Sequence, residues 1–216
     1  MARGKSDEKR RRILEAAVRV FARKGYHGAK VAEIAKRAGV ADGTIYLYFR
    51  NKEDILVSLF DEVMAEHIER ARVEMGRARG AAARLRVAAE HHLRLFSGNE
   101  DLAVVFQVEL RQSTKFLERF TASWLQDYFA LLGEAIAEGQ REGAIRPDLN
   151  RKLATKAFFG ILDEMVTSWT LGRKDYDVAD LAEPVVDLFL RGALASPRAS
   201  KARPALHAVA SARGGR

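Results

Sequence analysis

Hydrophobic residues recur at helical spacing along almost the whole chain, and no stretch keeps the alternation with period two that a half-buried strand shows. In residues 7–24 the apolar side chains fall on one stripe, and Gly25 ends that helix. A short helix is expected after a turn at Gly39, and further helices over residues 31–38, 51–75, 81–96, 102–113, 116–141, 150–171 and 178–193. The pattern predicts an all-α fold of about nine helices.

Polar residues mark several helix ends. Asn51 can cap the helix that follows, because an asparagine oxygen accepts a hydrogen bond from a backbone N–H of the first turn. After the loop at residues 143–148, either Asp148 or Asn150 caps the next helix. Pro184 leaves the start of the last helix open, since proline is tolerated only in a first turn or at a kink.

The segment from residue 31 to residue 49 has the organisation of a helix-turn-helix. Ala35 leaves room for two short helices to cross closely, and Gly39 tolerates the left-handed dihedral that a tight turn needs. The second helix of such a motif fits the major groove of DNA. Thr44, Tyr46 and Tyr48 then offer hydroxyls along its exposed side. The sequence therefore predicts that the first three helices form a DNA-binding head.

Positive charge is concentrated at the same end of the chain. The net charge is +8, of which residues 1–57 carry +7 and residues 196–216 carry +5, so that residues 58–195 carry −4. Because phosphate neutralisation supplies most non-specific affinity for DNA, a basic head on an acidic body suits DNA binding by one end. The basic run at residues 9–12 is either a solvated helix face or a phosphate contact, and its place beside the helix-turn-helix favours the second.

The same residues carry a family resemblance. Residues 10–60 resemble the N-terminal domain of the TetR family of bacterial regulators, through the tyrosine-rich helix followed by Asn51-Lys52-Glu53. Residues 39–56, 102–113 and 160–169 resemble the TetR-type regulators of fatty-acid degradation. The resemblance covers about residues 10–193. Ligand domains usually diverge within this family, so similarity there is more informative than similarity in the head.

The resemblance implies roles for residues of the head. Thr44, Tyr46, Tyr48 and Lys52 match positions that typically contact phosphate or the groove, while Asp42 and Gly43 lie nearest the base edges. Asp42 can accept from a cytosine amino group, or it can simply favour the positive end of its helix. Where the family usually has Thr or Ser, this chain has Ala29-Lys30, so Lys30 is a candidate phosphate contact instead. Tyr46 can also be partly structural, with its ring against Phe49 or the first helix.

The body is rich in aromatic residues, which taken alone indicate a hydrophobic core. The resemblance implies in addition that the body encloses the acyl chain of a long-chain acyl-CoA, with cations for the coenzyme A head at the mouth. The candidate ligand-binding residues are Phe96, Phe106, Glu109, Arg111, Gln112, Trp124, Tyr128, Phe159, Asp163 and Trp169.

Three charged positions of that set have alternative explanations. Arg111 is the candidate partner of the coenzyme A phosphate, and a buried pairing of Glu109 with Arg111 across neighbouring helices is the structural alternative. Asp163-Glu164 lies on an otherwise apolar helix, so it needs a partner arginine, a helix–helix hydrogen bond or a ligand amide.

Motifs of catalysis and metal binding are missing from the sequence. It has no cysteine, phosphate loop or nucleophile elbow, so neither an enzyme nor a cofactor is expected. Glu90-His91-His92 invites a metal site, but no histidine has Glu three residues before it, as carboxylate-bridged di-iron bundles require. One of His91 and His92 is instead expected to be half-buried and the other exposed. No apolar run approaches a membrane span, and residues 1–5 lack a signal peptide's apolar segment, so a cytoplasmic protein is expected.

These observations combine into one functional hypothesis. Helices 150–171 and 178–193 carry apolar stripes with small residues at Ala157, Gly160 and Gly192, which would pair with their symmetry mates in a four-helix dimer interface. We expect a DNA-binding domain at residues 1–50, a ligand-binding and dimerisation domain at residues 51–195, and a basic, disordered tail at residues 196–216. The expected protein is a homodimeric repressor of fatty-acid degradation genes that binds a palindromic operator and is released by long-chain acyl-CoA. A different apolar effector, such as a drug or another lipid, is the alternative, and a small helical acyl-CoA hydrolase is the hypothesis from another class.

Overall fold

The computed structural model describes residues 2–109, 111, 124–172 and 175–193, and the side chains from Ser6 onward within these ranges. This part of the chain contains nine α-helices and no strand, which confirms the all-α fold. The elements in chain order are α1 (Ala2–Gly28), α2 (Val31–Ala38), α3 (Asp42–Ile45), α4 (Lys52–Arg77), α5 (Ala81–Arg94), α6 (Glu100–Val104), the π-helix η1 (Val105–Glu109), α8 (Trp124–Arg141), α9 (Arg151–Leu171), the 3₁₀ helix η3 (Val178–Leu181) and α10 (Ala182–Ala193). The expected basic tail lies outside the described residues.

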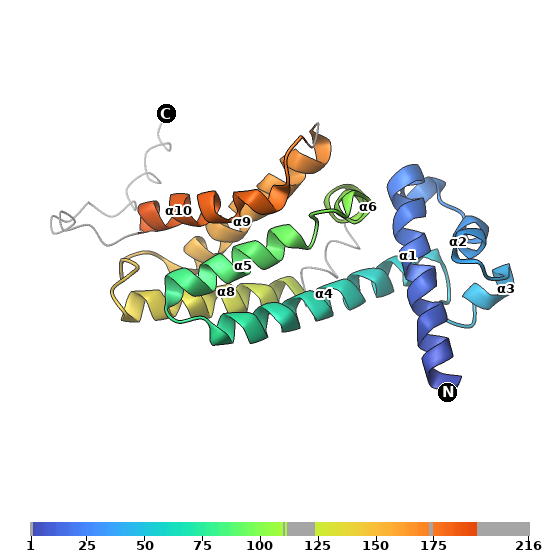
Figure 1. Ribbon diagram of the computed structural model, residues 1–216, viewed down its shortest axis with the longest axis horizontal. Helices are drawn as coiled ribbons and strands as arrows, with labels where there is room; N and C mark the ends of the chain where they lie inside the picture. Colours follow the sequence, from blue (N-terminus) through green and yellow to red (C-terminus); the bar gives the residue numbers. More distant parts are fainter. Residues whose placement is uncertain (1, 110, 112–123, 173–174, 194–216) are drawn as a thin grey trace, which may run out of the picture.

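Helices α1, α2 and α3 form the head at one end of an elongated molecule (Figure 1). Gly39 has φ 68° and ψ 39°, so the turn between α2 and α3 uses the left-handed conformation expected there. Ile34, Ala35, Ile45 and Phe49 are buried in the head core. Helix α3 has only four residues, and the chain beyond it continues as a tight turn, with Leu47 N–H donating to the Thr44 carbonyl at 3.2 Å.

Helix α4 joins the head to the body. The Asn51 side chain accepts from the Asp54 N–H at 2.8 Å, which confirms the expected cap. Ile55 and Leu56 in the first turns are fully buried, and the helix then runs on into the body (Figure 1). The domain boundary expected after residue 50 falls just before this helix and stays a prediction.

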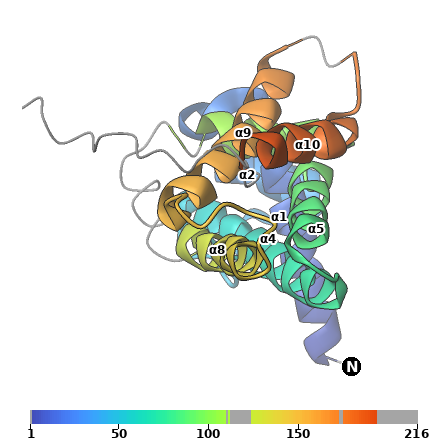
Figure 2. The same ribbon diagram turned by 90° about the vertical axis from the view of Figure 1, so that its left-hand side faces the viewer.

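The body is a bundle of α4, α5, α8, α9 and α10, seen end-on in Figure 2. Its interior is apolar, with Leu85, Leu93, Leu132, Phe158 and Leu162 fully buried. Helices α5 and α8 approach closely at Gly139, where a Cβ would lie 2.7 Å from the Ala81 Cβ. Among the described helices, none is both long and apolar enough to cross a membrane.

Two helix starts that the sequence left open are settled by the backbone. Asn150 caps α9, since its side chain accepts from the Leu153 N–H at 3.0 Å. Pro184 lies in the first turn of α10, after the short 3₁₀ helix, where its missing N–H costs nothing. The single helix expected from residue 102 is different: α6 ends at Val104 and the chain continues as a π-helix to Glu109. The wider π turn changes the direction in which the later side chains point.

Candidate DNA-binding and effector sites

The recognition surface is formed by α3 and the turn that follows it. Ile45 and Phe49 are buried and anchor this segment, whereas Asp42 and Gly43 are exposed and Thr44 and Tyr48 are half-buried. Tyr46 is 58% exposed, so its ring faces solvent rather than the head core. The predicted hydroxyl-bearing residues therefore share one segment, which is accessible from outside.

Leu47 in the same turn is 81% exposed, and sequence reasoning missed it. A single leucine among tyrosines belongs to no periodic pattern that would place it on a surface, and an apolar residue at such a position is normally expected in the core. An apolar side chain on a DNA-facing surface can contact a thymine methyl group.

Lys30 is the N-cap residue of α2 and is exposed. Its backbone N–H donates to the Glu33 carboxylate at 3.3 Å, and its side chain makes no capping hydrogen bond. The Lys24 ammonium pairs with the same carboxylate and, with Lys30 as a weaker contributor, lowers the pKa of Glu33. A phosphate contact by Lys30 stays a prediction that this geometry permits.

Lys52 has different partners from the predicted phosphate. Its Nζ donates to the carbonyls of Tyr26 at 2.6 Å, Ala29 at 2.9 Å and His27 at 3.2 Å. The ammonium also lies 4.7 Å from the centroid of the Tyr26 ring. Since an ammonium has three N–H donors, this geometry makes Lys52 an anchor of the turn between α1 and α2. Its contact with phosphate stays a prediction.

The basic run at residues 9–12 is largely engaged within the protein. Arg10 pairs with Glu62 and lies 5.2 Å from the Phe49 ring centroid. Arg11 pairs with Glu8 and Glu15 along α1, and Arg12 donates to the Ala38 carbonyl at the end of α2. These contacts give the three arginines partners within the protein, and a phosphate contact by this run stays a prediction.

Four of the predicted effector residues come together inside the body. The Phe96 and Phe106 rings have centroids 5.7 Å apart, and those of Tyr128 and Phe159 are 6.1 Å apart. His92 lies among them, stacked on Tyr128 at 5.8 Å. His92 is buried and His91 half-buried, so the expectation that one of the two would be exposed is wrong.

The two tryptophans of the predicted set have hydrogen-bond partners of their own. Trp124 Nε1 donates to Asp61 of α4 at 2.8 Å. Trp169 Nε1 donates to the Tyr176 carbonyl at 2.9 Å, beyond the end of α9. Gln112, another member of the predicted set, lies outside the described residues.

His67 and His92 are among the buried polar residues of the interior, and sequence reasoning assigned no role to either. Burial lowers the pKa of His67 to about 3 and that of His92 to about 4, with His92 and His91 adding to the effect at His67. Burial also raises the pKa of the Tyr128 hydroxyl. Within the described part of the chain, neither Nε2 atom has a hydrogen-bond partner. His67 was detectable, since it lies at helical spacing from Met64 and Ala71 on the buried face of α4.

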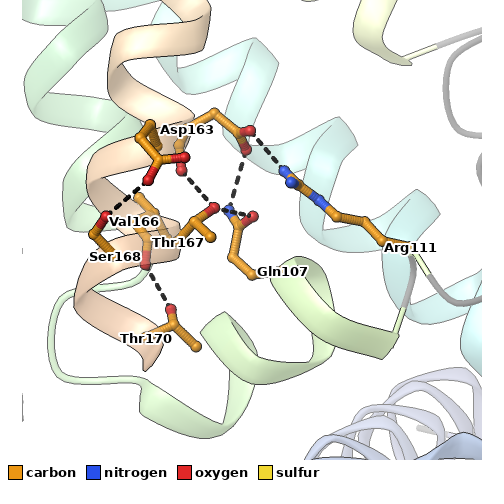
Figure 3. A network of polar contacts seen from close by, with 8 residues as sticks. Gln107, Arg111, Asp163, Val166, Thr167, Ser168 and Thr170 are labelled. Carbon is orange, nitrogen blue, oxygen red and sulfur yellow. Dashed lines mark hydrogen bonds and ion pairs between the residues drawn. The ribbon is translucent and has the colours of Figure 1, made fainter. Parts of the chain in front are cut away.

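Asp163 is the centre of a polar network between α9 and the segment after α6 (Figure 3). Its carboxylate accepts from Arg111 Nη2 at 2.6 Å and from Gln107 Nε2 at 3.2 Å. Thr167 donates to the Gln107 side-chain oxygen at 3.0 Å. Of the three explanations for Asp163, the structure has the partner arginine and the helix–helix hydrogen bond. Glu164 is exposed and accepts from Ser168 of its own helix at 2.8 Å.

Glu109 does not pair with Arg111, so that alternative is wrong. Its carboxylate accepts instead from the Tyr26 N–H of α1 at 2.6 Å, across 83 positions of the chain. The two residues separate because the π-helix directs Glu109 toward the head and Arg111 toward α9. Sequence reasoning offered no signal for this contact.

One hollow of the described surface is a groove of about 730 Å³ between α8 and α9. Phe129, Ala130 and Leu153 contribute apolar walls, while Lys152 and Lys156 contribute cations. A smaller, more polar hollow of about 400 Å³ lies between α4 and α5, with His67 in its wall. Neither hollow is lined by the predicted effector residues. In the described residues, no three His, Asp or Glu side chains are placed to hold a metal ion.

Two family profiles match the chain. Residues 13–59 match "Bacterial regulatory proteins, tetR family", and residues 60–192 match "YsiA-like protein, C-terminal region". The chain is 43% identical over 180 residues to the "Fatty acid metabolism regulator protein" of Bacillus subtilis, an alignment that covers 83% of this chain and 93% of that protein. The similarity thus extends through both head and body.

Two solved structures have the same fold. One is the fatty acid degradation regulator FadR from Bacillus halodurans, with a TM-score of 0.78 and 43% identity over 84% of this chain and 97% of that one. The other is FadR from Bacillus subtilis in complex with stearoyl-CoA, with a TM-score of 0.79 and 42% identity over the same shares of the two chains, 84% and 97%.

Proposed function

The chain belongs to the TetR family of bacterial transcriptional regulators, and we propose that it represses genes of fatty-acid degradation and releases its operator when it binds a long-chain acyl-CoA. One observation carries this proposal: the 43% identity to a fatty acid metabolism regulator extends over 83% of the chain, including the ligand domain. A relative of 42% identity was solved with stearoyl-CoA. Such a repressor acts in the cytoplasm, where the operator DNA and the acyl-CoA pool meet.

The head would bind DNA through the exposed segment after Gly39. Tyr46 and Leu47 project furthest, Asp42 and Gly43 begin the helix, and Lys30 lies at the N-terminus of α2. Thr44 and Tyr48 would complete the set, with Lys52 holding the turn that carries Lys30. A single head of this kind contacts one half-site, so two heads are needed for a palindrome with half-sites about 34–36 Å apart.

The homodimer would form through α9 and α10. Leu153, Leu171 and Leu188 are 63%, 70% and 65% exposed, and apolar residues that gather on one exposed surface mark interaction sites. Between the two exposed leucines of α9, Ala157 and Gly160 are exposed on the same face, and a Cβ at Gly160 or at Gly192 of α10 would meet no atom within 4 Å. Small residues between large ones allow the close approach of a second copy.

The dimer has its own test. Gly160→Arg should convert the protein to a monomer in analytical ultracentrifugation and leave its helical circular dichroism unchanged, because the added side chain meets open space within one copy. Gly43→Ala, also at an open position, is the matched control. A Gly160→Arg protein that sediments as a dimer would place the interface elsewhere.

The residues that line the body's groove support an anionic amphiphile as the effector. The groove between α8 and α9 combines apolar walls with Arg151, Lys152 and Lys156, the combination that an acyl chain with a phosphate-bearing head requires. The aromatic interior around His92 is the second candidate place for the chain. Lys156→Ala and Phe159→Ala should each weaken stearoyl-CoA binding if the corresponding place is used, as isothermal titration calorimetry measures.

The decisive experiment for the function uses operator DNA enriched by the protein from a random duplex pool. Stearoyl-CoA should lower the affinity for this DNA, whereas stearate at the same concentration should not, as fluorescence anisotropy measures. An operator complex that persists at stearoyl-CoA concentrations shown to saturate the protein refutes the effector assignment, since an effector must have different affinities for the two conformers. Mass spectrometry of lipid co-purifying with the protein tests the alternative of another apolar effector. Intact stearoyl-CoA after long incubation with the protein excludes a hydrolase.

A further inference from the structure

The π-helix η1 contacts both the head and the body. In Figure 1, α6 lies between α1 of the head and α9 of the body. The π-helix η1 follows α6 along the chain and also contacts both α1 and α9. Val105, Phe106, Gln107 and Glu109 of this segment are all buried. The segment is therefore a packed connector between the two parts of the molecule.

On the head side, Glu109 is held against the break in α1. Gly25 has φ 70° and ψ 162°, which interrupts the helix just before Tyr26. The Glu109 carboxylate accepts from the Tyr26 N–H at 2.6 Å and is only 6% exposed. A Cβ at position 25 would make only an ordinary contact with this carboxylate, 3.5 Å from an oxygen, so it is the positive φ of the break that favours glycine there.

The same residue is held through its carbonyl as well. The Tyr26 carbonyl accepts from Lys52 Nζ at 2.6 Å, and Lys52 begins α4. The residue after the break in α1 therefore lies between an anion from the body and a cation from the helix that joins head and body. Both are charge-assisted hydrogen bonds, which are shorter and stronger than neutral ones.

On the body side, the neighbours of Glu109 are bound to α9. Gln107 and Arg111, two residues before and two residues after it, both donate to the Asp163 carboxylate (Figure 3). Thr167 fixes the remaining side-chain atom of Gln107. Glu109 is thus held between two attachments to the same helix, and a shift of the segment along α9 would move its carboxylate relative to Tyr26.

We propose that Glu109 is a positioning residue for operator binding, which sets the orientation of the head relative to the body through the Tyr26 amide. The hydrogen bonds from Gln107 and Arg111 to Asp163 keep Glu109 at a fixed position along α9. Loss of the carboxylate removes this acceptor from a partly buried N–H, so the contact surface of the head against α6 and η1 loosens. Operator affinity depends on this orientation because both heads must match their half-sites at once. This proposal rests on the proposed function only where operator affinity is the quantity measured.

The test measures head orientation without DNA. The sequence contains no cysteine, so Ala32→Cys on α2 and Arg141→Cys on α8, both exposed, accept two spin labels without competing sites. Labelled protein is diluted into an excess of unlabelled protein, so that pulsed electron resonance reads distances within one copy. Glu109→Ala should broaden the distance distribution and lower operator affinity about tenfold, the worth of one charge-assisted hydrogen bond.

Three further variants separate positioning from general destabilisation. Glu109→Gln retains an acceptor oxygen and should recover most of the affinity and the narrow distribution. Asp163→Asn should shift both readouts in the same direction as Glu109→Ala but less, and it keeps the test available if Glu109→Ala does not fold. Glu164→Gln, next to Asp163 but exposed, should change nothing.

An unchanged distance distribution in folded Glu109→Ala overturns the proposal, whatever happens to operator affinity. A wild-type protein that fails to bind its enriched DNA would refute the proposed function instead, and the distance measurement would still decide the role of Glu109.

Discussion

Acidification should destabilise this protein through its two buried histidines. His67 and His92 have pKa values of about 3 and about 4, against an ordinary value of 6.5, mainly because burial penalises the imidazolium. Their folded pKa values are depressed, so the unfolded chain binds protons first as the pH falls. The stabilisation is complete above pH 6.5 and is lost progressively from there toward about pH 4 and about pH 3.

The magnitude follows from proton linkage. Each histidine that stays neutral in the folded state costs about 1.4 kcal/mol for every pH unit below 6.5, which is about 2 kcal/mol at pH 5 and roughly 4 kcal/mol for the pair. The charged groups near them do not relieve this cost, since Arg70 and His91 both disfavour a proton on His67 and burial keeps the Tyr128 hydroxyl protonated. A loss of this size is a large part of the stability of an ordinary domain.

Urea unfolding at pH 7, 6 and 5, at one protein concentration, measures the effect. His92→Phe, among the rings of Phe96, Tyr128 and Phe159, should remove about half of the decrease between pH 7 and 5. His27→Phe, at an exposed position, should leave the decrease unchanged and is the matched control. The difference between variants cancels carboxylates such as Glu33 and Glu74, whose lowered pKa values place their effect at more acidic pH. Equal free energies of unfolding at pH 7 and 5 in the wild type, or titration of both buried rings near pH 6.5 in NMR spectra, would refute the reasoning.

Substitutions at four other positions give clear expectations. Gly139→Ala should destabilise the body by about 1–3 kcal/mol in urea unfolding, because its Cβ would meet Ala81 and Ile145 at 2.7 Å, and an unaffected variant would mean that α5 and α8 are farther apart. Asn51→Ala should cost about 1 kcal/mol of the free energy of unfolding through loss of the α4 cap, and Asn51→Asp should restore it. Lys52→Met should lower the melting temperature and weaken binding to all DNA without changing how the affinity depends on salt. Lys30→Ala should instead reduce the slope of log affinity against log salt concentration by about one, with no loss of stability. If Lys52→Met changes this slope and Lys30→Ala does not, Lys52 is the residue that contacts phosphate.

The similarity to the relatives says more about the ligand of the body than the fold alone does. Many different effectors can be bound inside the same helical architecture, so architecture by itself says little about the ligand. Identity of 43% that continues through residues of the body is more informative, because those residues define the shape and charge of the effector site. The Asp163 network belongs to the segments where the sequence resemblance was noted, and it now has a geometry that mutagenesis can test.

Features that depend on neighbouring residues were readable from the sequence alone. The helical period, the left-handed turn at Gly39, the Asn51 cap and the exposed hydroxyls after the turn all arise within a few positions of the chain, where steric and hydrogen-bonding preferences act directly. The family resemblance added the class of effector, which no local preference encodes.

Only the tertiary structure decided which charged and polar side chains meet. Glu109 could have paired with Arg111 two positions away, yet it binds Tyr26, while Arg111 binds Asp163 and Lys52 binds the turn that it supports. These partners are distant in sequence, and a change in helix register, such as the π-helix after Val104, exchanges one partner for another. Burial of His67 and His92 likewise depends on how α4, α5 and α8 pack, because a polar residue on an apolar face becomes costly only when a second helix covers it.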